Sequence, residues 1–109
     1  MGIIDKFRLD GRVAFVTGSS SGIGQAIAIA LAEAGATVIC HASKTGGASE
    51  TVAAIEKLGS RSAEVAGDMA DKSVPSKLIG EIIDKFGRID ILINNAGIAA
   101  GDEFDGRRR

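Results

Sequence analysis

Two hydrophobic patterns alternate along the chain. Short, almost wholly apolar runs are typical of strands that helices cover on both faces of a sheet. Four such runs, the third of them weaker, occupy residues 13–17, 37–40, 63–66 and 89–93. Between them, apolar residues recur at spacings of three and four, which is the pattern of one helix face. Three segments have this spacing: 23–34, 52–58 and 78–86. The sequence therefore predicts four strands separated by three helices.

Glycine and proline mark the ends of the predicted helices. Gly35, Gly59 and Gly87 each follow a helical segment directly, at the position where glycine ends a helix most readily. With Ser73 as N-cap, Pro75 falls in the first turn of the third helix, where its missing N–H has no partner to lose. Each predicted helix therefore stops at a residue that suits a helix end.

The alternation of strands and helices indicates the fold class. Repeated strand–helix–strand units have right-handed crossovers and place their strands parallel in one sheet. Continuous apolar strands, rather than alternating ones, suit a sheet that is covered on both faces. We therefore predict an α/β fold, a parallel sheet with helices on both faces.

Length and composition fit one domain. The chain has 109 residues, of which 45% are hydrophobic and 25% charged, so a single domain over 1–109 has a modest core. Residues 98–109 are polar and end in Arg107, Arg108 and Arg109. We expect this tail to be flexible or a scar of truncation. The alternative is a basic arm that meets nucleic acid or another partner.

Charge and cysteine content restrict the partners and the compartment. A net charge of −1 gives no attraction to nucleic acid or to an anionic membrane. The N-terminal residues hold no apolar stretch long enough for a signal peptide or a membrane span. The single cysteine, Cys40, lies in an apolar run and is predicted to be a buried thiol in a reducing compartment. We expect a cytoplasmic protein that binds neither nucleic acid nor membrane.

The segment FVTGSSSGIGQ, residues 15–25, joins the end of the first strand to the start of the first helix. Unpaired backbone N–H groups and the helix dipole favour an anion at such a helix start. Glycines without side chains let a phosphate approach the backbone, and the serines at 19–21 add hydroxyl donors. The alternative is a tight turn that needs glycine for its dihedral angles and binds nothing.

The spacing of the glycines excludes two phosphate-binding loops. No lysine follows the glycines, as a P-loop requires, and Ile27 stands where G-x-G-x-x-G has its last glycine. What remains is Thr17-Gly18-x-x-x-Gly22-x-Gly24. This pattern resembles the TGxxxGxG nucleotide loop of the short-chain dehydrogenase/reductase family.

Two further marks carry the same resemblance, which covers residues 7–100. Residues 94–97 read NNAG after the fourth strand, and Asp68 follows the third strand, where the family holds the adenine ring. The resemblance implies a Rossmann-type sheet with the strand order 3-2-1-4. It also implies a dinucleotide cofactor at the ends of the strands.

The cofactor contacts can be assigned from the resemblance. Ribose and pyrophosphate would meet the loop and the helix start at Gly18, Ser20, Ser21, Gly22, Ile23 and Gly24. The adenine would lie beside Asp68 and Met69, and the nicotinamide-side ribose beside Asn95, Ala96 and Gly97. Structural roles are the alternative: Asp68 as a turn acid, and the asparagines as partners of backbone groups at a strand end.

The choice between NADP and NAD follows from the end of the second strand. A carboxylate there would bind the 2′-OH of NAD and repel a 2′-phosphate. No acid stands between Glu33 and Glu50, whereas Ser43 and Lys44 offer a hydroxyl and an ammonium. We therefore predict NADP, with NAD as the alternative. The only histidine, His41, is expected to be partly exposed at this strand end and structural rather than catalytic.

The resemblance implies hydride transfer between the nicotinamide and a carbonyl or alcohol carbon of a small molecule. In the family a tyrosine acts as acid or base, with a lysine, a serine and an asparagine, and all would follow the NNAG segment. The chain contains no tyrosine, so no catalytic residue is assigned to it, and no metal site is expected. We interpret the chain as the cofactor-binding half of an oxidoreductase that forms a homo-oligomer. The alternative is a non-catalytic dinucleotide-binding or assembly module, complete at 109 residues.

Overall fold

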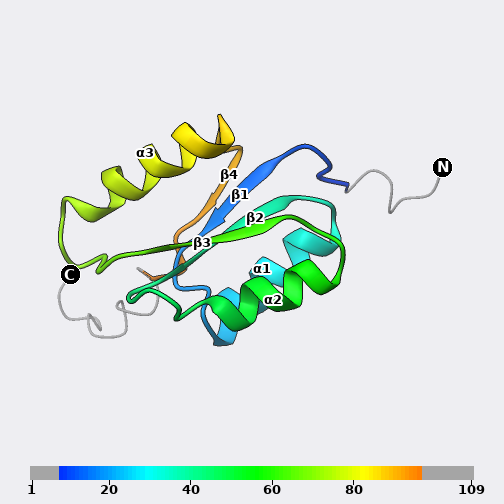
Figure 1. Cartoon of the computed structure of the whole chain (residues 1–109), viewed down its shortest axis with the longest axis horizontal. Coiled ribbons are helices and arrows are strands. Elements are labelled where there is room, and N and C mark those ends of the chain that lie inside the picture. Colours follow the sequence, from blue (N-terminus) through cyan, green and yellow to red (C-terminus); the bar gives the residue numbers. More distant parts are fainter. Residues whose placement is uncertain (1–7, 97–109) are drawn as a thin grey trace, which may run out of the picture.

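A four-stranded parallel sheet forms the centre of the computed structural model, which describes residues 8–96 (Figure 1). The strands are β1 (Val13–Val16), β2 (Thr37–Ala42), β3 (Ser62–Ala66) and β4 (Ile91–Ile93). The helices are α1 (Gly22–Glu33), α2 (Ser49–Lys57) and α3 (Val74–Phe86). The strand order is β3-β2-β1-β4, and all neighbours are parallel, which confirms the predicted Rossmann-type sheet.

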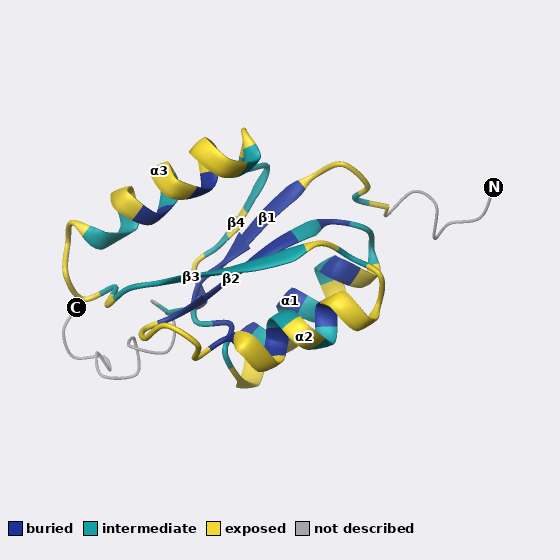
Figure 2. Ribbon diagram, viewed as in Figure 1, coloured by how far each residue is buried: buried dark blue, intermediate teal, exposed yellow. Residues whose placement is uncertain are grey.

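The helices cover both faces of the sheet. Figure 1 shows α1 and α2 on one side and α3 on the other. Along β1 the side chains alternate between these layers: Ala14 and Val16 pack in the core under α1 and α2, while Val13 and Phe15 pack with Leu78 of α3. Every residue of β1 is buried as a result (Figure 2), which explains why this strand reads as a continuous apolar run.

Several element boundaries differ from the predicted ones, and three of them have a cause that the structure shows. β2 continues to Ala42 because Ala42 pairs with Ala66 of β3. β4 begins only at Ile91. Before it, the Val13 N–H donates to the Asp90 carboxylate and not to a backbone carbonyl. α2 begins at Ser49 with a polar first turn, which gives no apolar periodicity for the sequence to reveal.

The ends of α3 follow the sequence signals, with one exception. Ser73 is the N-cap, Pro75 lies in the first turn, and Gly87 ends the helix with a left-handed φ of 86°. The Ser73 hydroxyl makes no capping hydrogen bond, however, because it donates to Oδ1 of Asp71 at 2.8 Å. The proline and the glycine, rather than the serine hydroxyl, therefore define the limits of this helix.

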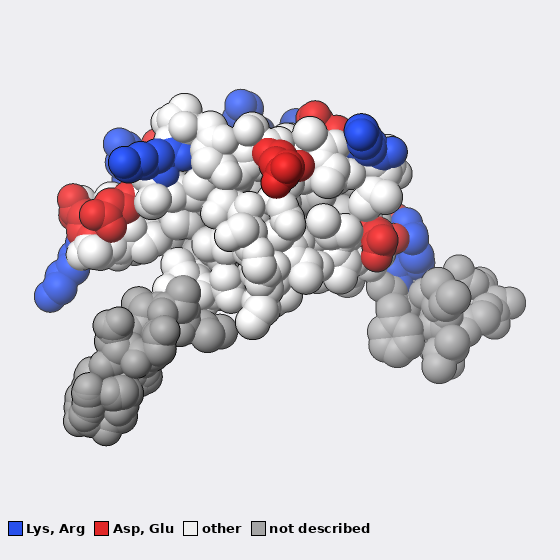
Figure 3. Space-filling model, turned by 90° about the horizontal axis from the view of Figure 1, so that it is seen from below, with Lys and Arg blue, Asp and Glu red and all other residues white. Residues whose placement is uncertain are grey.

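The face of the molecule in Figure 3 carries charges of both signs. On the face shown in Figure 3, basic and acidic side chains of the described residues are interspersed near the rim, around a largely uncharged middle. Among residues 8–96, no helix is both long enough and apolar enough to cross a membrane.

Cys40 is fully buried, as predicted, and burial raises the pKa of its thiol. The predicted tail 98–109 lies outside the described residues.

Asp90 fastens the start of β4 to the start of β1. Its carboxylate accepts a hydrogen bond from the Val13 backbone N–H at 2.8 Å and two from the Arg88 guanidinium, at 2.8 and 3.1 Å. Arg88 first, and then the Val13 N–H, holds the pKa of the Asp90 carboxyl below its usual range. The Asp90 side chain is only 13% exposed. The ionised carboxylate therefore stabilises the folded state.

We expect Asp90→Asn to lower the urea midpoint of unfolding at neutral pH. Because the folded pKa is lowered, the contribution of the carboxylate is complete above the ordinary aspartate pKa of about 3.9 and is lost as the pH falls through the folded value. The difference in urea midpoint between wild type and Asp90→Asn should therefore disappear in acid. Urea unfolding followed by circular dichroism measures it, with exposed Asp84→Asn of α3 as the control. A gap of the same size at every pH would contradict this assignment.

Candidate functional site

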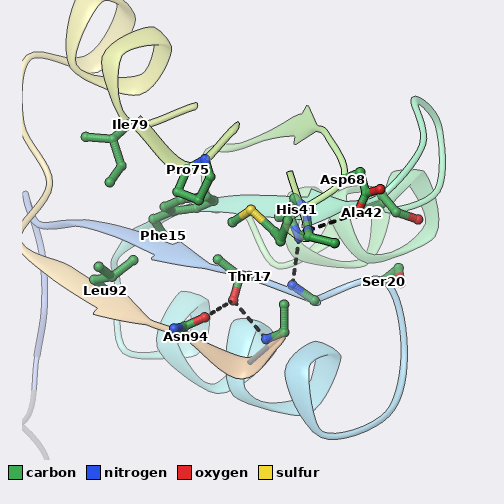
Figure 4. A pocket seen from close by; sticks show the side chains of 15 residues that line it. Phe15, Thr17, Ser20, His41, Ala42, Asp68, Pro75, Ile79, Leu92 and Asn94 are labelled. Carbon is green, nitrogen blue, oxygen red and sulfur yellow. Dashed lines mark hydrogen bonds between the residues drawn. The ribbon is translucent and has the colours of Figure 1, made fainter. Parts of the chain in front are cut away.

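A cavity of about 580 Å³ opens at the carboxyl ends of the strands (Figure 4). β1, β2, β4 and α3 contribute to it, together with the segment after β3. Its lining comprises Phe15, Thr17, Gly18, Ser20, His41, Ala42, Ser43, Asp68, Met69, Ala70, Pro75, Ile79, Leu92, Asn94 and Ala96. Six of the residues predicted from the sequence are therefore brought together: Gly18, Ser20, Ser43, Asp68, Met69 and Ala96. Ligands of open α/β sheets bind at this edge.

The cavity has an apolar part that the sequence did not predict. In Figure 4, Phe15, Pro75, Ile79 and Leu92 lie together on one side, and Asp68 and Ser20 lie on the other. The apolar residues come from two strands and a helix, where each reads as an ordinary core position. The strand order alone brings them to one cavity, so no local sequence pattern identifies them as cavity residues.

The three glycines of the loop have different structural reasons. Gly18 and Gly22 have left-handed φ values of 61° and 58°, which L side chains rarely adopt. Gly24 lies within α1, where a Cβ would clash with the Gly18 carbonyl oxygen and approach Nδ2 of Asn95 to 2.6 Å. A Cβ at Gly22 would meet no atom of the chain within 4 Å. Gly22 thus faces open space, whereas Gly24 is required by packing.

The first turn of α1 leaves room for an anion. Ser21 is the exposed N-cap, with extended backbone angles, and its side chain makes no capping hydrogen bond. No acidic residue stands in the first turn of α1, and Ile23 is 70% exposed. The helix dipole is therefore unopposed by a carboxylate at this end.

The serines at 19–21 do not share one role. Ser19 is fully buried, its hydroxyl donates to the Val16 carbonyl at 2.9 Å, and its oxygen accepts from the His41 backbone N–H at 2.8 Å. The prediction that Ser19 offers a hydroxyl to a phosphate is therefore wrong, because its bonds lie within the chain. Ser20 is half-buried in the cavity lining and Ser21 is exposed.

The segment after β4 is tied to the glycine loop. The Thr17 hydroxyl accepts a hydrogen bond from the Ala96 N–H at 2.9 Å and can donate to Oδ1 of Asn94 at 3.2 Å. Nδ2 of Asn95 donates to the Gly18 carbonyl at 3.0 Å, and Asn95 is only 9% exposed. The Asn95 amide thus satisfies a backbone group, the structural role that the sequence left open. Gly97 lies outside the described residues.

His41 is buried, which corrects the expectation that it is partly exposed. It is 3% exposed, because β2 continues past it and its ring reaches backbone groups on both sides. The Gly18 N–H donates to Nδ1 at 2.9 Å, and Nε2 lies 2.9 Å from the Gly67 carbonyl oxygen. The ring also lines the cavity. The expected structural role is consistent with these bonds.

The loop after β2 is held by a carboxylate of β3. Glu64 accepts hydrogen bonds from the backbone N–H groups of Gly46 at 2.6 Å and Ala48 at 2.7 Å. Ser43 and Lys44 are exposed at the start of this loop, and Ser43 reaches the cavity. Glu64 therefore fixes the backbone that follows the two candidate 2′-phosphate ligands.

Asp68 begins the segment between β3 and α3. Its Oδ1 accepts a hydrogen bond from the Ala70 N–H at 2.9 Å, which is the turn role left open by the sequence. Asp68 is nevertheless exposed, and it lines the cavity together with Met69. Within residues 8–96, no group of three or more His, Cys, Asp and Glu side chains is arranged to hold a metal ion.

The parallel sheet and its glycine loop place the protein among the Rossmann-type α/β proteins. More specifically, the chain belongs to the short chain dehydrogenase family, whose sequence model matches residues 12–107. The resemblance carried by the three motifs is thereby confirmed.

Relatives and solved structures of this family are similar to the chain. It is 43% identical over 97 residues to an L-rhamnose 1-dehydrogenase (NAD(P)(+)) of Sphingomonas, covering 88% of this chain and 38% of that protein. It is 38% identical over 111 residues to versicolorin reductase 1 of Dothistroma septosporum, covering 94% of this chain and 42% of that protein. A 3-oxoacyl (acyl-carrier-protein) reductase from Agrobacterium tumefaciens with NADP bound superposes with a TM-score of 0.77 and 42% identity, over 84% of this chain and 35% of that one. The chain thus spans well under half the length of these relatives.

Proposed function

We propose that the chain is the cofactor-binding part of an NAD(P)-dependent oxidoreductase, which moves a hydride between nicotinamide and a carbonyl or alcohol carbon of a small molecule. The observation that carries the proposal is the open glycine loop beside the cavity. Gly22 leaves space where any other residue would place a Cβ, and the first turn of α1 holds no acid. This combination suits a pyrophosphate.

The described residues fit the two ends of a dinucleotide. The pyrophosphate and its ribose would lie against Gly18, Ser20, Ser21, Gly22, Ile23 and Gly24. Asp68 and Met69 would border the adenine, and Asn95, Ala96 and Gly97 would border the nicotinamide-side ribose. In this proposal Gly24 and Asn95 act through Gly18, since both are packed against it. The nicotinamide supplies or accepts the hydride when it is bound.

The proton transfer of the reaction is not assigned to this chain. It has no tyrosine, and both ring nitrogens of its only histidine already bond backbone groups. What the described residues can do is bind the dinucleotide, orient it and exclude water from its nicotinamide end. A soluble cytoplasmic protein with a small-molecule substrate, acting as a homo-oligomer, suits this proposal.

NADP is the proposed cofactor. Ser43 and Lys44 stand at the end of β2 with no acid among the neighbouring loop residues 43–49. Glu64 of β3 reaches this loop, and both of its carboxylate oxygens accept hydrogen bonds from backbone N–H groups there. A hydroxyl and an ammonium can therefore meet a 2′-phosphate at residues 43 and 44, while the Glu64 carboxylate is bonded to the backbone of Gly46 and Ala48. The Agrobacterium tumefaciens reductase, which has NADP bound, supports this choice.

Calorimetric titration of the chain with NADPH and then NADH tests the proposed function. Circular dichroism, recorded on the same sample, establishes that the chain is folded. We expect saturable binding of both, with NADPH the tighter ligand. A folded chain that takes up neither dinucleotide would overturn the proposal.

The charge at residue 44 should separate the two cofactors. We expect Lys44→Glu to weaken NADPH binding by about tenfold and to leave NADH binding within about twofold, because only NADPH carries a 2′-phosphate. Lys57→Glu, the same charge change at the far end of α2, is the control. Equal losses for NADPH and NADH in the Lys44 variant would count against the 2′-phosphate assignment.

A further inference from the structure

His41 joins three segments that border the candidate dinucleotide cavity. It lies on β2, its Nδ1 accepts from the Gly18 N–H after β1, and its Nε2 faces the Gly67 carbonyl after β3, each at 2.9 Å. Figure 4 shows the labelled His41 ring beside the cavity, with its hydrogen bond to the Gly18 N–H dashed. The backbone of His41 also bonds Ser19, since Ser19 N–H donates to the His41 carbonyl at 3.0 Å. One buried side chain therefore fixes the ends of three strands.

These bonds define the protonation state of the imidazole. A carbonyl oxygen only accepts, so Nε2 must carry the hydrogen that reaches Gly67. A backbone N–H only donates, so Nδ1 must offer its lone pair to Gly18. The ring is therefore neutral in this arrangement. An imidazolium has a hydrogen on both nitrogens and cannot accept the Gly18 bond.

We propose that His41 is a positioning residue for the dinucleotide: the lone pair on Nδ1 of its neutral imidazole holds the Gly18 backbone in the binding conformation, and loss of this acceptor weakens the binding. The inference rests on the proposed function and adds a positioning residue to the same site. His41 would not touch the reacting atoms. Its effect would pass through the loop that borders the pyrophosphate.

Gly18 has little freedom to adapt to the loss of this bond. Its N–H is held by His41, its carbonyl is held by Asn95, and its φ of 61° is that of a tight turn. A Cβ at Gly18 would approach the Ala96 backbone to 3.2 Å, so the residue is also closely packed. Without the Nδ1 acceptor, the Gly18 N–H would lose its partner, and the loop would have to move to find another.

Titrations of wild type, His41→Asn and His41→Ala with NADP⁺ at one constant pH test the inference. The amide oxygen of asparagine can accept from the Gly18 N–H as Nδ1 does, whereas alanine offers no acceptor. Both variants lack the imidazole ring, so a loss of binding that only His41→Ala shows is due to the missing acceptor.

We expect wild type and His41→Asn to bind NADP⁺ within about threefold of each other, and His41→Ala to bind about tenfold more weakly. If the Ala variant does not fold, the Gly18 amide resonance of wild type and His41→Asn provides the second readout. It should keep the position of a hydrogen-bonded N–H in both proteins.

The outcomes separate the inference from the proposed function. A folded His41→Ala variant that binds NADP⁺ as tightly as wild type would overturn the role of His41 alone. A folded His41→Asn variant that keeps the Gly18 hydrogen bond but binds as weakly as His41→Ala would do the same. A folded wild type that fails to bind NADP⁺ would overturn the proposed function, and the role of His41 with it.

Discussion

Replacing Gly24 by alanine is expected to lower the free energy of unfolding by about 3 kcal/mol and to abolish dinucleotide binding. Gly24 is buried in the first turn of α1, and a Cβ there would clash with the Gly18 carbonyl oxygen and lie 2.6 Å from Nδ2 of Asn95. The clash involves backbone, so no flexible side chain can move aside. Either α1 moves away from the loop, or the Asn95–Gly18 hydrogen bond breaks.

Gly80→Ala is the matched control for this substitution. Gly80 also lies within a helix, α3, but a Cβ there would meet no atom within 4 Å. Alanine should be neutral or stabilise α3 by up to about 1 kcal/mol, because glycine is a poor helix former. Urea unfolding followed by circular dichroism compares the two variants, and calorimetry with NADPH compares their binding. Equal stability of both variants would show that the loop and α1 are not in close contact.

The fold could be predicted because its signals are local and repeat along the chain. The run around Phe15 is apolar at every position because helices cover both faces of β1, and Gly87 follows the last residue of α3. Gly18 and Gly22 also have left-handed φ values, the dihedral requirement that the sequence left open as the alternative for this loop. In each case the physical cause acts on the residue itself or on its near neighbours.

The bonds of the site could not be predicted in the same way. The ring of His41 meets Gly18 and Gly67, which are 23 and 26 residues away in the chain. A lone histidine at a strand end gives no sign of such partners, and the expectation of partial exposure was therefore wrong. Ser19 was misjudged for the same reason, since its hydroxyl bonds Val16 and its neighbour across the loop is His41. Burial of polar groups depends on contacts that only the folded chain brings together.

The second large effect is expected at Gly22, where valine should abolish dinucleotide binding while the chain still folds. A Cβ at this position meets no atom of the chain within 4 Å, so the branched side chain would occupy the open space before α1 in which the pyrophosphate is proposed to lie. The left-handed φ of 58° adds backbone strain of about 1–2 kcal/mol. This strain must be separated from the steric exclusion of the ligand.

Gly59→Val makes that separation. Gly59 follows α2, has a left-handed φ of 88° and also faces open space, so valine there introduces similar strain away from the loop. Both variants should lose a similar amount of stability in urea, but only Gly22→Val should lose the calorimetric signal with NADPH. If the folded Gly22 variant bound NADPH as wild type does, the pyrophosphate could not lie against the start of α1. If both variants lost binding equally, strain in the fold would account for the loss, because the two substitutions share the strain and differ in their distance from the glycine loop.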